Sequence, residues 1–521
     1  MILGPDLLAV TRPGEVGLAR LTSDGSLVDL DWIQCGDWQL VGWAARDLLA
    51  LRRRGELALL DTGRRMLTST HPVVGRTLRF NGTQALVAVV RNGRPVLCLH
   101  RPLTGAYQVL DATEGVSSVA SWDPAARTAL INRDGQVVLV RYDDSSAVEI
   151  GAASAASGDG PLIAVTGHDG PGVLDLHTGE VRWFAPGGTG IAVSRSGLLL
   201  TMAWTDHRYV YRVLDHDGQV VGTAVPDHGI ATDLTFTADE RHLLGRHQSP
   251  AAPPVLAKWE IHSGRMTALQ QRTEIAVRWQ HRESELSPEW LYEPEGGGHG
   301  GVVLHLHGGP RSQLRQIHEP MIAALVAAGW TVIGMNYPGS SGYSDEFRDA
   351  VVGDWGGADV AAVVARLRAL KGDRPVCLYG QSYGAYLALL AAAPDLVDAV
   401  AVWAPVTDLP RLLESATGLH RQWLRTELGA LADDPRGLSE RSPINRPYNA
   451  PRLMVGHSKG DDRCPVDQSR RFVELVGADR YVEQPGDGHE PADFEGWSDA
   501  VVKHFGQVAC RANTSDGVVA S

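Results

Sequence analysis

Cysteine is scarce in this chain, and the few cysteines form no recognisable pattern. The five cysteines among the 521 residues, Cys35, Cys98, Cys377, Cys464 and Cys510, are odd in number and widely spaced. Such spacing fits neither a disulfide framework nor a zinc site. We therefore expect reduced cysteines that serve in packing, and no bound metal.

Long apolar runs and a net positive charge are also missing. No segment is apolar over enough residues to span a bilayer, and the first residues lack the basic start and apolar region of a signal peptide. The formal net charge of −13 argues against nucleic acid or an anionic membrane as a partner. The sequence therefore predicts a cytoplasmic protein with neither of these partners, and it leaves a homo-oligomer open.

The first half of the chain, to about residue 272, consists of short alternating or β-branched runs with few segments of helical period. Seven x-Gly dipeptides stand between apolar runs at intervals of roughly forty residues, the length of a four-stranded propeller blade. They are Asp24-Gly25, Arg54-Gly55, Asn92-Gly93, Asp134-Gly135, Thr178-Gly179, Asp217-Gly218 and Ser263-Gly264. Because one blade cannot bury both of its faces, a ring of seven is favoured over one or two β-sandwiches.

From Thr273 onward, predicted strands alternate with helices, which favours a mostly parallel sheet covered on both faces. The strands are expected at 275–279, 290–294, 302–306, 331–335, 397–403, 452–456 and 480–485, and the helices at 319–328, 357–370 and 493–505. A chain of 521 residues is too long for one core. We therefore predict a β-propeller at 1–272, an α/β domain at 273–509 and a disordered tail at 510–521.

One stretch of the second half, residues 374–393, carries a short apolar strand, a G-x-S-x-G turn and an Ala/Leu-rich helix. A serine hydroxyl is a useful nucleophile only when it lies beside a base, with backbone N–H groups aimed at the oxyanion. A tight turn exposes Ser382 at a helix N-terminus, and Gly380 and Gly384 remove Cβ atoms that would collide there. The motif also arises by chance, so its weight comes from its context.

Candidates for an acid and a base follow Ser382 in the chain order of an α/β-hydrolase triad. Asp461 and the adjacent Asp462 follow the predicted strand 452–456, and His489 follows the predicted strand 480–485. The carboxyl ends of parallel strands meet at one edge of the sheet, where such folds bind ligands. His489 would take the proton from Ser382, and Asp461 would fix its tautomer and stabilise the imidazolium.

The segment His307-Gly308-Gly309-Pro310 leaves the predicted strand 302–306, where an α/β-hydrolase places half of its oxyanion hole. Its glycines allow backbone N–H groups to face a substrate, and the N–H of Tyr383 would supply the other half. A metal pair of His305 and His307 is rejected, since no further ligands lie nearby in the sequence.

Together these segments resemble the prolyl oligopeptidase family of serine peptidases, and within it the acylaminoacyl-peptidase and dipeptidyl-peptidase-like branch. The motifs that carry the resemblance are 307–310, 336–343, 380–384, 441–445, 461–465 and 488–489, in the order of the family. The sequence departs from the usual family pattern at Pro338, where arginine is common, and at Ala385, where glycine is common. Neither position belongs to the triad.

The resemblance implies an α/β-hydrolase domain with a seven-bladed propeller, no cofactor, and a triad of Ser382, Asp461 and His489. Asp461 is preferred to Asp462 because its spacing from His457 matches the family. The backbone N–H groups of Gly309 and Tyr383 are then the expected oxyanion hole. Trp423 and Leu424 are the expected walls of the S1 pocket that binds the substrate.

Three functions are compatible with these residues. The leading interpretation is a serine hydrolase that cleaves short peptides or N-acylated amino acids through an acyl-enzyme, with the propeller limiting substrate size. The alternative is an esterase, amidase or acyl transferase that acts on a small metabolite in a biosynthetic pathway. A propeller interaction module with a silent hydrolase domain is disfavoured by the complete triad. The choice between exopeptidase and endopeptidase stays open.

Overall fold

The computed structural model describes residues 2–515 apart from short gaps. The gaps are residues 4–6, 13–14, 22–26, 35–37, 46–47, 54–55, 62–65, 73–75, 81–83, 92–93, 102–105, 124–126, 134–135, 143–145, 157–160, 169, 186, 206–207, 225, 227, 285–286, 417, 449–451 and 487. The chain forms two compact units, the first made of residues 1–247 and 254–272, the second of 248–253 and 273–521.

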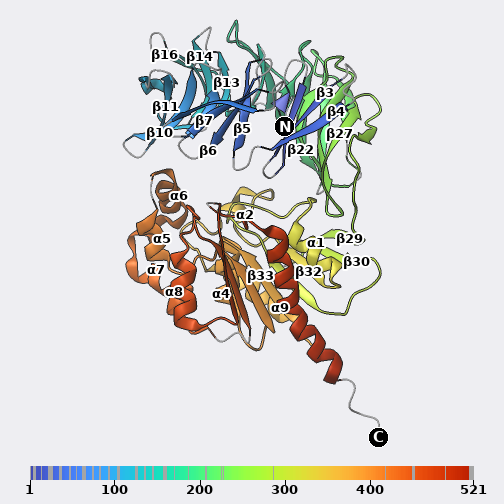
Figure 1. The fold of residues 1–521 in the computed structure, drawn as a ribbon, viewed down its shortest axis with the longest axis vertical. Helices are drawn as coiled ribbons and strands as arrows, with labels where there is room; N and C mark the ends of the chain where they lie inside the picture. The colour runs from blue at the N-terminus through green and yellow to red at the C-terminus, as the bar shows by residue number, and fades with distance from the viewer. Residues whose placement is uncertain are drawn as a thin grey trace. The chain divides into compact units, whose positions relative to one another are not determined.

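The first unit consists almost entirely of β-strands (Figure 1). Its first four sheets are β1 (Ile2–Leu3), β2 (Leu7–Arg12), β3 (Glu15–Leu21), β4 (Leu27–Gln34); β5 (Gln39–Ala45), β6 (Leu48–Arg53), β7 (Glu56–Asp61), β8 (Met66–Pro72); β9 (Arg76–Phe80), β10 (Ala85–Arg91), β11 (Arg94–Arg101), β12 (Ala106–Leu110); and β13 (Val116–Asp123), β14 (Thr128–Arg133), β15 (Gln136–Arg141), β16 (Ser146–Glu149). A short 3₁₀ helix, η1 (Asp111–Thr113), follows the third sheet.

The remaining sheets of this unit are β17 (Ser154–Ala155), β18 (Leu162–Gly167), β19 (Gly170–Asp175), β20 (Val181–Trp183); β21 (Thr189–Val193), β22 (Leu199–Thr205), β23 (Arg208–Leu214), β24 (Val220–Ala224); and β25 (Ile230–Phe236), β26 (His242–Ser249), β27 (Ala252–Glu260), β28 (Met266–Ala268). Within the described residues, the strands of this unit therefore fall into seven four-stranded sheets, each built from strands consecutive in the chain.

Each predicted x-Gly turn belongs to a different one of these sheets. Asp24-Gly25, Arg54-Gly55, Asn92-Gly93 and Asp134-Gly135 lie outside the described residues, but the strands on both sides of each are present. Gly179, Gly218 and Gly264 have φ angles of 76°, 78° and 68°, which favour glycine. The prediction of seven blades is confirmed.

Successive sheets share apolar clusters, because each blade buries one face against the next. Leu97 of the third sheet packs with Ile131 of the fourth. The fourth and fifth sheets share a second cluster that includes Leu130 and Ile163, and the neighbouring residues Leu130 and Ile131 thus serve opposite faces of one sheet. The first unit is therefore a seven-bladed propeller whose core lies between its blades.

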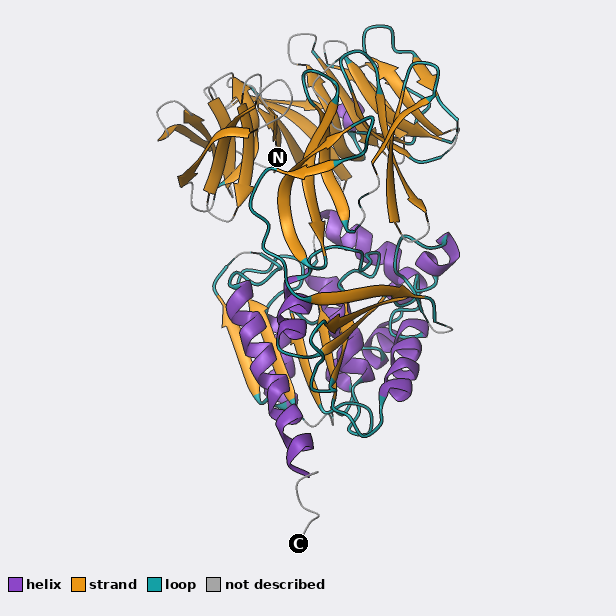
Figure 2. Ribbon diagram, turned by 90° about the vertical axis from the view of Figure 1, so that its right-hand side faces the viewer, coloured by secondary structure: helices purple, strands orange, loops and turns teal. Residues whose placement is uncertain are grey.

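The second unit is an eight-stranded sheet with helices on both sides (Figure 2). Its strands are β29 (Val277–Arg282), β30 (Glu289–Pro294), β31 (Val302–Leu306), β32 (Thr331–Met335), β33 (Val376–Gln381), β34 (Ala399–Trp403), β35 (Leu453–Ser458) and β36 (Arg480–Gln484). They lie in the order β29-β30-β32-β31-β33-β34-β35-β36, antiparallel up to β32 and parallel beyond it.

The helices of this unit are α1 (Pro320–Ala327), α2 (Asp345–Asp349), α3 (Ala358–Leu370), α4 (Tyr383–Ala391), α5 (Leu409–Ser415), α6 (Gly418–Leu428), α7 (Pro435–Glu440), α8 (Asp467–Val476) and α9 (Phe494–Ser515), with 3₁₀ helices η2 (Gly429–Asp433) and η3 (Pro443–Asn445). Leu378 of β33 packs among residues of α3 and α4, whereas Tyr379 on the opposite face bonds Trp497 of α9. Alternate residues of one strand thus serve the two covered faces, as in a doubly wound sheet. None of the helices in the described part of the chain is long and apolar enough to cross a membrane.

The predicted strands and long helices of the second half are present, with two differences. The first strand lies at Val277–Arg282, slightly later than the predicted 275–279. Helix α9 runs through Ser515, so the beginning of the predicted tail at 510–521 is helical; between Cys510 and Gly517 the sequence has neither glycine nor proline to interrupt the helix. The end of the predicted tail, residues 516–521, lies outside the described residues.

Candidate active site

Strand β33 passes into helix α4 through Ser382, which has φ 53° and ψ −115°. A Cβ atom on Gly380 would lie 2.3 Å from the carbonyl oxygen of Gly384, and one on Gly384 would lie 2.3 Å from that of Leu306. Both positions therefore require glycine, as the sequence predicts. The N–H of Ser382 donates to the carbonyl oxygen of Trp403 at 2.8 Å. This bond and the packed glycines hold a backbone conformation that costs a non-glycine residue about 1–3 kcal/mol.

His489 and Asp461 are in direct contact at the same edge of the sheet. The Nδ1–H of His489 donates to Oδ2 of Asp461 at 2.6 Å. The side chain of Asp461 is 0% exposed and that of His489 is 9% exposed. Asp462 is exposed to solvent instead. The structure thus brings Asp461 to the imidazole, and a proton on Nδ1 leaves the lone pair of His489 on Nε2.

Asp461 is surrounded by donors. Its Oδ1 accepts the backbone N–H groups of Arg463 at 2.9 Å and Cys464 at 3.0 Å. Nε2 of His457 lies 3.3 Å from Oδ2. Burial on its own would raise the pKa of Asp461, but the hydrogen bonds from His457 and His489 outweigh it and hold that pKa well below the usual range. The carboxylate is therefore ionised throughout the neutral pH range.

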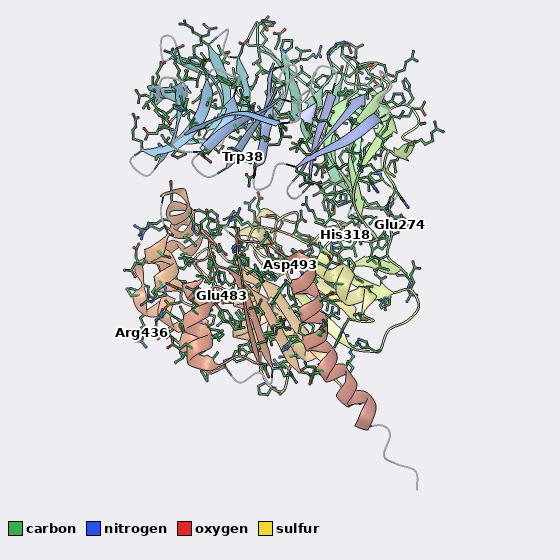
Figure 3. The ribbon with its side chains drawn as sticks, in the orientation of Figure 1. Trp38, Glu274, His318, Arg436, Glu483 and Asp493 are labelled. Atoms are coloured by element: carbon green, nitrogen blue, oxygen red, sulfur yellow. The ribbon has the colours of Figure 1, made fainter. Side chains whose placement is uncertain are left out.

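The loop that carries His489 is closed at its base. The side chain of Gln484, at the end of β36, donates to the carbonyl oxygen of Asp493 at 3.0 Å and accepts the Asp493 N–H at 2.9 Å. Figure 3 labels Asp493 together with Glu483, which precedes Gln484 at the other end of the loop. The indole N–H of Trp403 donates to the carbonyl oxygen of His489 at 2.9 Å. These bonds fix the backbone from which the imidazole projects.

The segment after β31 runs beside the nucleophile candidate. A Cβ atom on Gly308 would lie 3.5 Å from the Cβ of Ser382, and Gly309 has φ 149°, a value that favours glycine. Tyr383 is the first residue of α4. Its N–H is one of the helix N-terminal donors that have no acceptor within the helix. Both backbone groups predicted for the oxyanion hole therefore belong to segments that adjoin Ser382.

The side chain of Tyr383 is anchored beneath this site. Its phenol donates a short hydrogen bond to Oδ2 of Asp359, a carboxylate that is 0% exposed. The N–H of Val360 donates to the other oxygen of Asp359 at 2.8 Å. Burial raises the pKa of Asp359 and raises the pKa of Tyr383 well above its ordinary value. The bond ties the start of α4 to the start of α3.

His307 has a packing role in the segment after β31. Its Nδ1–H donates to the carbonyl oxygen of Gly308 at 2.6 Å, and its Nε2 lies 2.9 Å from Oγ of Ser340. Burial lowers the pKa of His307 to about 4, so the ring is neutral. Across the described part of the chain, no group of three or more His, Cys, Asp or Glu side chains is placed to hold a metal ion.

The two residues predicted to line the S1 pocket lie side by side on α6 but differ in exposure. Leu424 is 1% exposed and packs in the core of the unit, whereas Trp423 is 38% exposed. The ring of Trp423 meets that of Trp355 at 6.2 Å between centroids, and Trp355 meets Tyr383 at 4.7 Å. An aromatic row therefore leads from the surface of α6 to the residue after Ser382.

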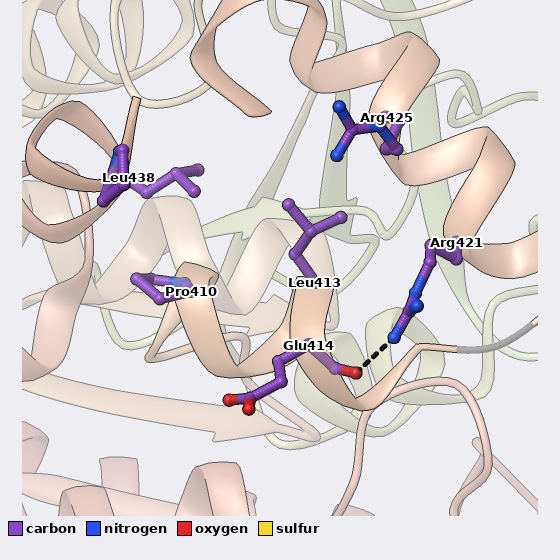
Figure 4. Close-up of a pocket in the computed structure, with 7 residues that line it drawn as sticks. Pro410, Leu413, Glu414, Arg421, Arg425 and Leu438 are labelled. Carbon is purple, nitrogen blue, oxygen red and sulfur yellow. Dashed lines mark hydrogen bonds between the residues drawn. The ribbon is translucent and has the colours of Figure 1, made fainter. Parts of the chain in front are cut away.

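A cavity of about 330 Å³ opens among helices α5, α6 and α7 (Figure 4). It is lined by Pro410, Leu413, Glu414, Arg421, Arg425, Pro435 and Leu438. Arg421 donates to the carbonyl oxygen of Glu414 at 2.6 Å across its edge. The lining contains neither the triad residues nor Trp423 and Leu424, so this cavity is separate from the predicted substrate pocket.

Comparison with known proteins shows which family part of the second unit resembles. Residues 318–483, about a third of the chain, match the model of the prolyl oligopeptidase family of peptidases. This part of the chain is similar to that family. The matched segment contains Ser382 and Asp461 and ends shortly before His489.

Individual relatives match only part of this chain. An uncharacterized peptidase, YuxL, of Bacillus subtilis (strain 168) is 27% identical over 221 residues, which make up 40% of this chain and 32% of that protein. Acylamino-acid-releasing enzyme 1 of Oryza sativa subsp. japonica is 30% identical over 222 residues, 37% of this chain and 28% of that protein. The match thus spans about a third of the length of these relatives.

A solved structure extends the comparison to the whole fold. The puromycin-hydrolyzing peptidase of Mycobacterium tuberculosis superposes with a TM-score of 0.69 at 18% sequence identity, over 96% of this chain and 94% of that one. At this identity the likeness concerns the fold. It agrees with the propeller and α/β-hydrolase units predicted from the sequence.

Several residues around this candidate site escaped the sequence analysis. Gln381 donates a short hydrogen bond to the carboxylate of Glu490, and Asp359 holds Tyr383 as described. His457 was noted only for its spacing from Asp461. One signal for His457 was available in the sequence: it is a polar residue that follows an apolar run, in a strand whose residues are all buried. Because buried polar groups are normally hydrogen-bonded, such a residue is expected to have specific partners.

Proposed function

We propose that this protein is a serine peptidase that cleaves short peptides or N-acylated amino acids through an acyl-enzyme. Ser382 is the nucleophile, His489 the base and Asp461 the residue that orients it. The observation that carries the proposal is the 2.6 Å hydrogen bond between His489 and Asp461 at the sheet edge where the strained turn presents Ser382. The match of residues 318–483 to the prolyl oligopeptidase family model supports the same assignment.

The proposed reaction follows from this geometry. Oγ of Ser382 attacks the substrate carbonyl while Nε2 of His489 takes its proton, and the imidazolium is stabilised by the ionised Asp461. The backbone N–H groups of Gly309 and Tyr383 receive the oxyanion. His489 then returns the proton to the leaving amine, which departs and leaves an acyl group on Ser382. Water, deprotonated by His489, completes the hydrolysis.

The substrate class is supported by the names of similar proteins, which release acylated amino acids or hydrolyse puromycin. An acylated amino acid and puromycin are both small, which favours short substrates. We assign Trp423 and Leu424 to the pocket for the side chain of that amino acid, since the aromatic row from Trp423 ends at Tyr383. The propeller, residues 1–272, would restrict the size of what enters the hydrolase domain, residues 273–509.

Two further assignments complete the proposal. A reducing compartment such as the cytoplasm suits the free, buried thiols of Cys98, Cys377 and Cys464, which the structure shows without disulfide partners among the described residues. The peptide substrate is the only partner that the chemistry requires. Light scattering on the purified protein would establish whether it forms a homo-oligomer.

The test is a substrate panel run on the wild-type protein and on Ser382→Ala. We expect hydrolysis of acyl-amino-acid and short peptide amides by the wild type, and a loss of several powers of ten in kcat for the variant. Ser415→Ala is the matched control, since within the described part of the chain its hydroxyl donates to the carbonyl oxygen of Leu412 in its own helix. Turnover of small esters without any amide cleavage would instead favour an esterase or acyl transferase.

A further inference from the structure

His457, at the end of β35, is a buried histidine outside the triad. Its side chain is 0% exposed. Nδ1 lies 2.7 Å from Oγ of Ser469 on α8, and Nε2 lies 2.8 Å from the carbonyl oxygen of Cys464. A carbonyl oxygen can only accept, so Nε2 carries the proton and Nδ1 accepts the hydroxyl of Ser469. Two partners on other segments thus fix the tautomer of the ring.

The protonated Nε2 of His457 also faces the acid of the triad. It lies 3.3 Å from Oδ2 of Asp461, the same oxygen that accepts Nδ1–H of His489 at 2.6 Å. Two imidazole rings therefore share one carboxylate oxygen, while the backbone of Arg463 and Cys464 occupies the other. A carboxylate held by three hydrogen bonds and by this fourth contact has little freedom to rotate.

We propose that His457 is a positioning residue for the reaction, which holds Oδ2 of Asp461 toward His489 and takes up part of its negative charge. This inference rests on the proposed function of the triad. A carboxylate that shares its charge with a second donor attracts the His489 imidazolium less strongly. Removing the contact from His457 should therefore strengthen this attraction, and the reactivity of Ser382 should then require a higher pH.

A histidine that only fills space in the core would have a different signature. Its replacement would lower stability and the amount of active protein, but the pH at which His489 becomes a base would stay the same. The pH dependence of nucleophile reactivity therefore separates the two roles. The other titratable or charged groups around Asp461 and His489 are His420 on α6, Asp462, Arg463, Cys464 and Glu490. They are unchanged in every variant below.

Two substitutions at position 457 each keep the hydrogen-bonding group of one ring nitrogen and remove that of the other. In His457→Gln the amide nitrogen reaches the place of Nε2 and can still donate to Asp461, but Ser469 loses its acceptor. In His457→Asn the amide oxygen takes the place of Nδ1 and keeps Ser469 satisfied, but nothing donates to Asp461. The reporter is the rate at which a fluorophosphonate labels Ser382 in the full-length protein, measured from pH 5 to pH 9, so no natural substrate is needed.

We expect the acid limb of the labelling profile to move up by about half to one pH unit in His457→Asn, and to stay near the wild-type position in His457→Gln. Equal shifts in both variants, or no shift in His457→Asn, would overturn the positioning role. If His457→Asn does not fold, His457→Met serves instead, because a thioether fills much of the same space but has no donor for Asp461. It should move the limb in the same direction, and an unmoved limb would again overturn the proposal. Wild-type protein that is not labelled at Ser382 would refute the proposed function instead.

Discussion

Replacing Asp461 by asparagine removes an acceptor on which several donors converge. The carboxylate accepts from His489 and from two backbone N–H groups, and it lies 3.3 Å from Nε2 of His457. An amide of the same shape offers one oxygen and one NH₂ group that can only donate. If the NH₂ faces His489, the proton must move from Nδ1 to Nε2, which can then no longer accept from Ser382. If it faces the loop instead, it opposes the N–H groups of Arg463 and Cys464.

The expected loss of activity is large. A wrong imidazole tautomer lowers kcat of a serine peptidase by about 10⁴-fold, which corresponds to about 5 kcal/mol of activation free energy. Asp462→Asn is the matched control, since Asp462 is exposed and its neighbour Asp461 makes the contact to His489. A surface change of this kind alters stability by about 0.5 kcal/mol or less, so kcat should stay within about twofold.

Stability should respond to pH in a way that is specific to Asp461. Burial opposes the charged form, but the hydrogen bonds from His457 and His489 prevail and the pKa of Asp461 is depressed in the folded protein. Its contribution to the free energy of unfolding is therefore fully present above the unfolded value of about 4 and is lost as pH falls through the folded value. The stability difference between wild type and Asp461→Asn should accordingly shrink below about pH 4.

Both effects can be measured on purified variants. Steady-state kinetics on an acyl-amino-acid amide gives kcat, and urea unfolding at a series of pH values gives stability. The reasoning fails if Asp461→Asn retains more than about 1% of wild-type kcat, or if Asp462→Asn is the more damaging change. It also fails if the stability difference between wild type and Asp461→Asn does not decrease in acid.

Three other outcomes are expected. Gly384→Ala should lower the unfolding free energy by about 1–3 kcal/mol, because its Cβ would lie 2.3 Å from the carbonyl oxygen of Leu306. Thermal denaturation should show no such loss for the control Gly372→Ala, whose Cβ would meet no atom of the described residues within 4 Å apart from its chain neighbours. Tyr383→Phe leaves the buried Asp359 without its phenol donor, so the pKa of Asp359, already raised by burial, should rise further. Chemical unfolding should then show a loss of stability that grows as pH increases from about 4 toward neutrality. A recognition sequence should be cleaved strongly as a free peptide and poorly as a short unfolded tail on a stable folded domain; equal rates would exclude size selection by the propeller.

The propeller and the nucleophile turn were predictable because their signals are local. Each blade has an x-Gly turn between two strands, and the turn around Ser382 needs glycine on both sides for steric reasons that the motif itself displays. The order of nucleophile, acid and base along the chain then reflects how parallel strands bring distant residues to one edge. These parts of the site depend on short-range rules that a single sequence carries.

The helices between β34 and β35 were not predicted, although their boundaries have a signature. Asp408 and Asp434 each precede a proline in the first turn of a short helix, and their carboxylates accept the N–H groups of Arg411 and Gly437. Such helices are too short for apolar periodicity to be recognised. Asp-x-Pro and Asp-Pro signals could have located α5 and α7, and with them the region that bears Trp423.

Contacts between distant side chains could not be predicted from the sequence. Only the family resemblance favoured Asp461 over Asp462. The two residues themselves do not say which one turns inward, because that depends on the path of the loop and on His457 across from it. The bond between Asp359 and Tyr383 likewise joins two helices that meet only in the folded chain. Burial and partner identity are properties of packing, and packing is set by the whole domain.

The tip of the hairpin between β26 and β27 limits how this protein can be dissected. Residues 248–253 belong to the second unit although both of their strands belong to the first. The carbonyl oxygen of Ala251 accepts the N–H of Ile275, and the side chain of Gln248 accepts that of His318. A gene fragment that starts at Thr273 would therefore encode a hydrolase lacking a piece of its own edge. An expression clone for an isolated catalytic half would need to supply that hexapeptide again, by circular permutation or as a grafted loop.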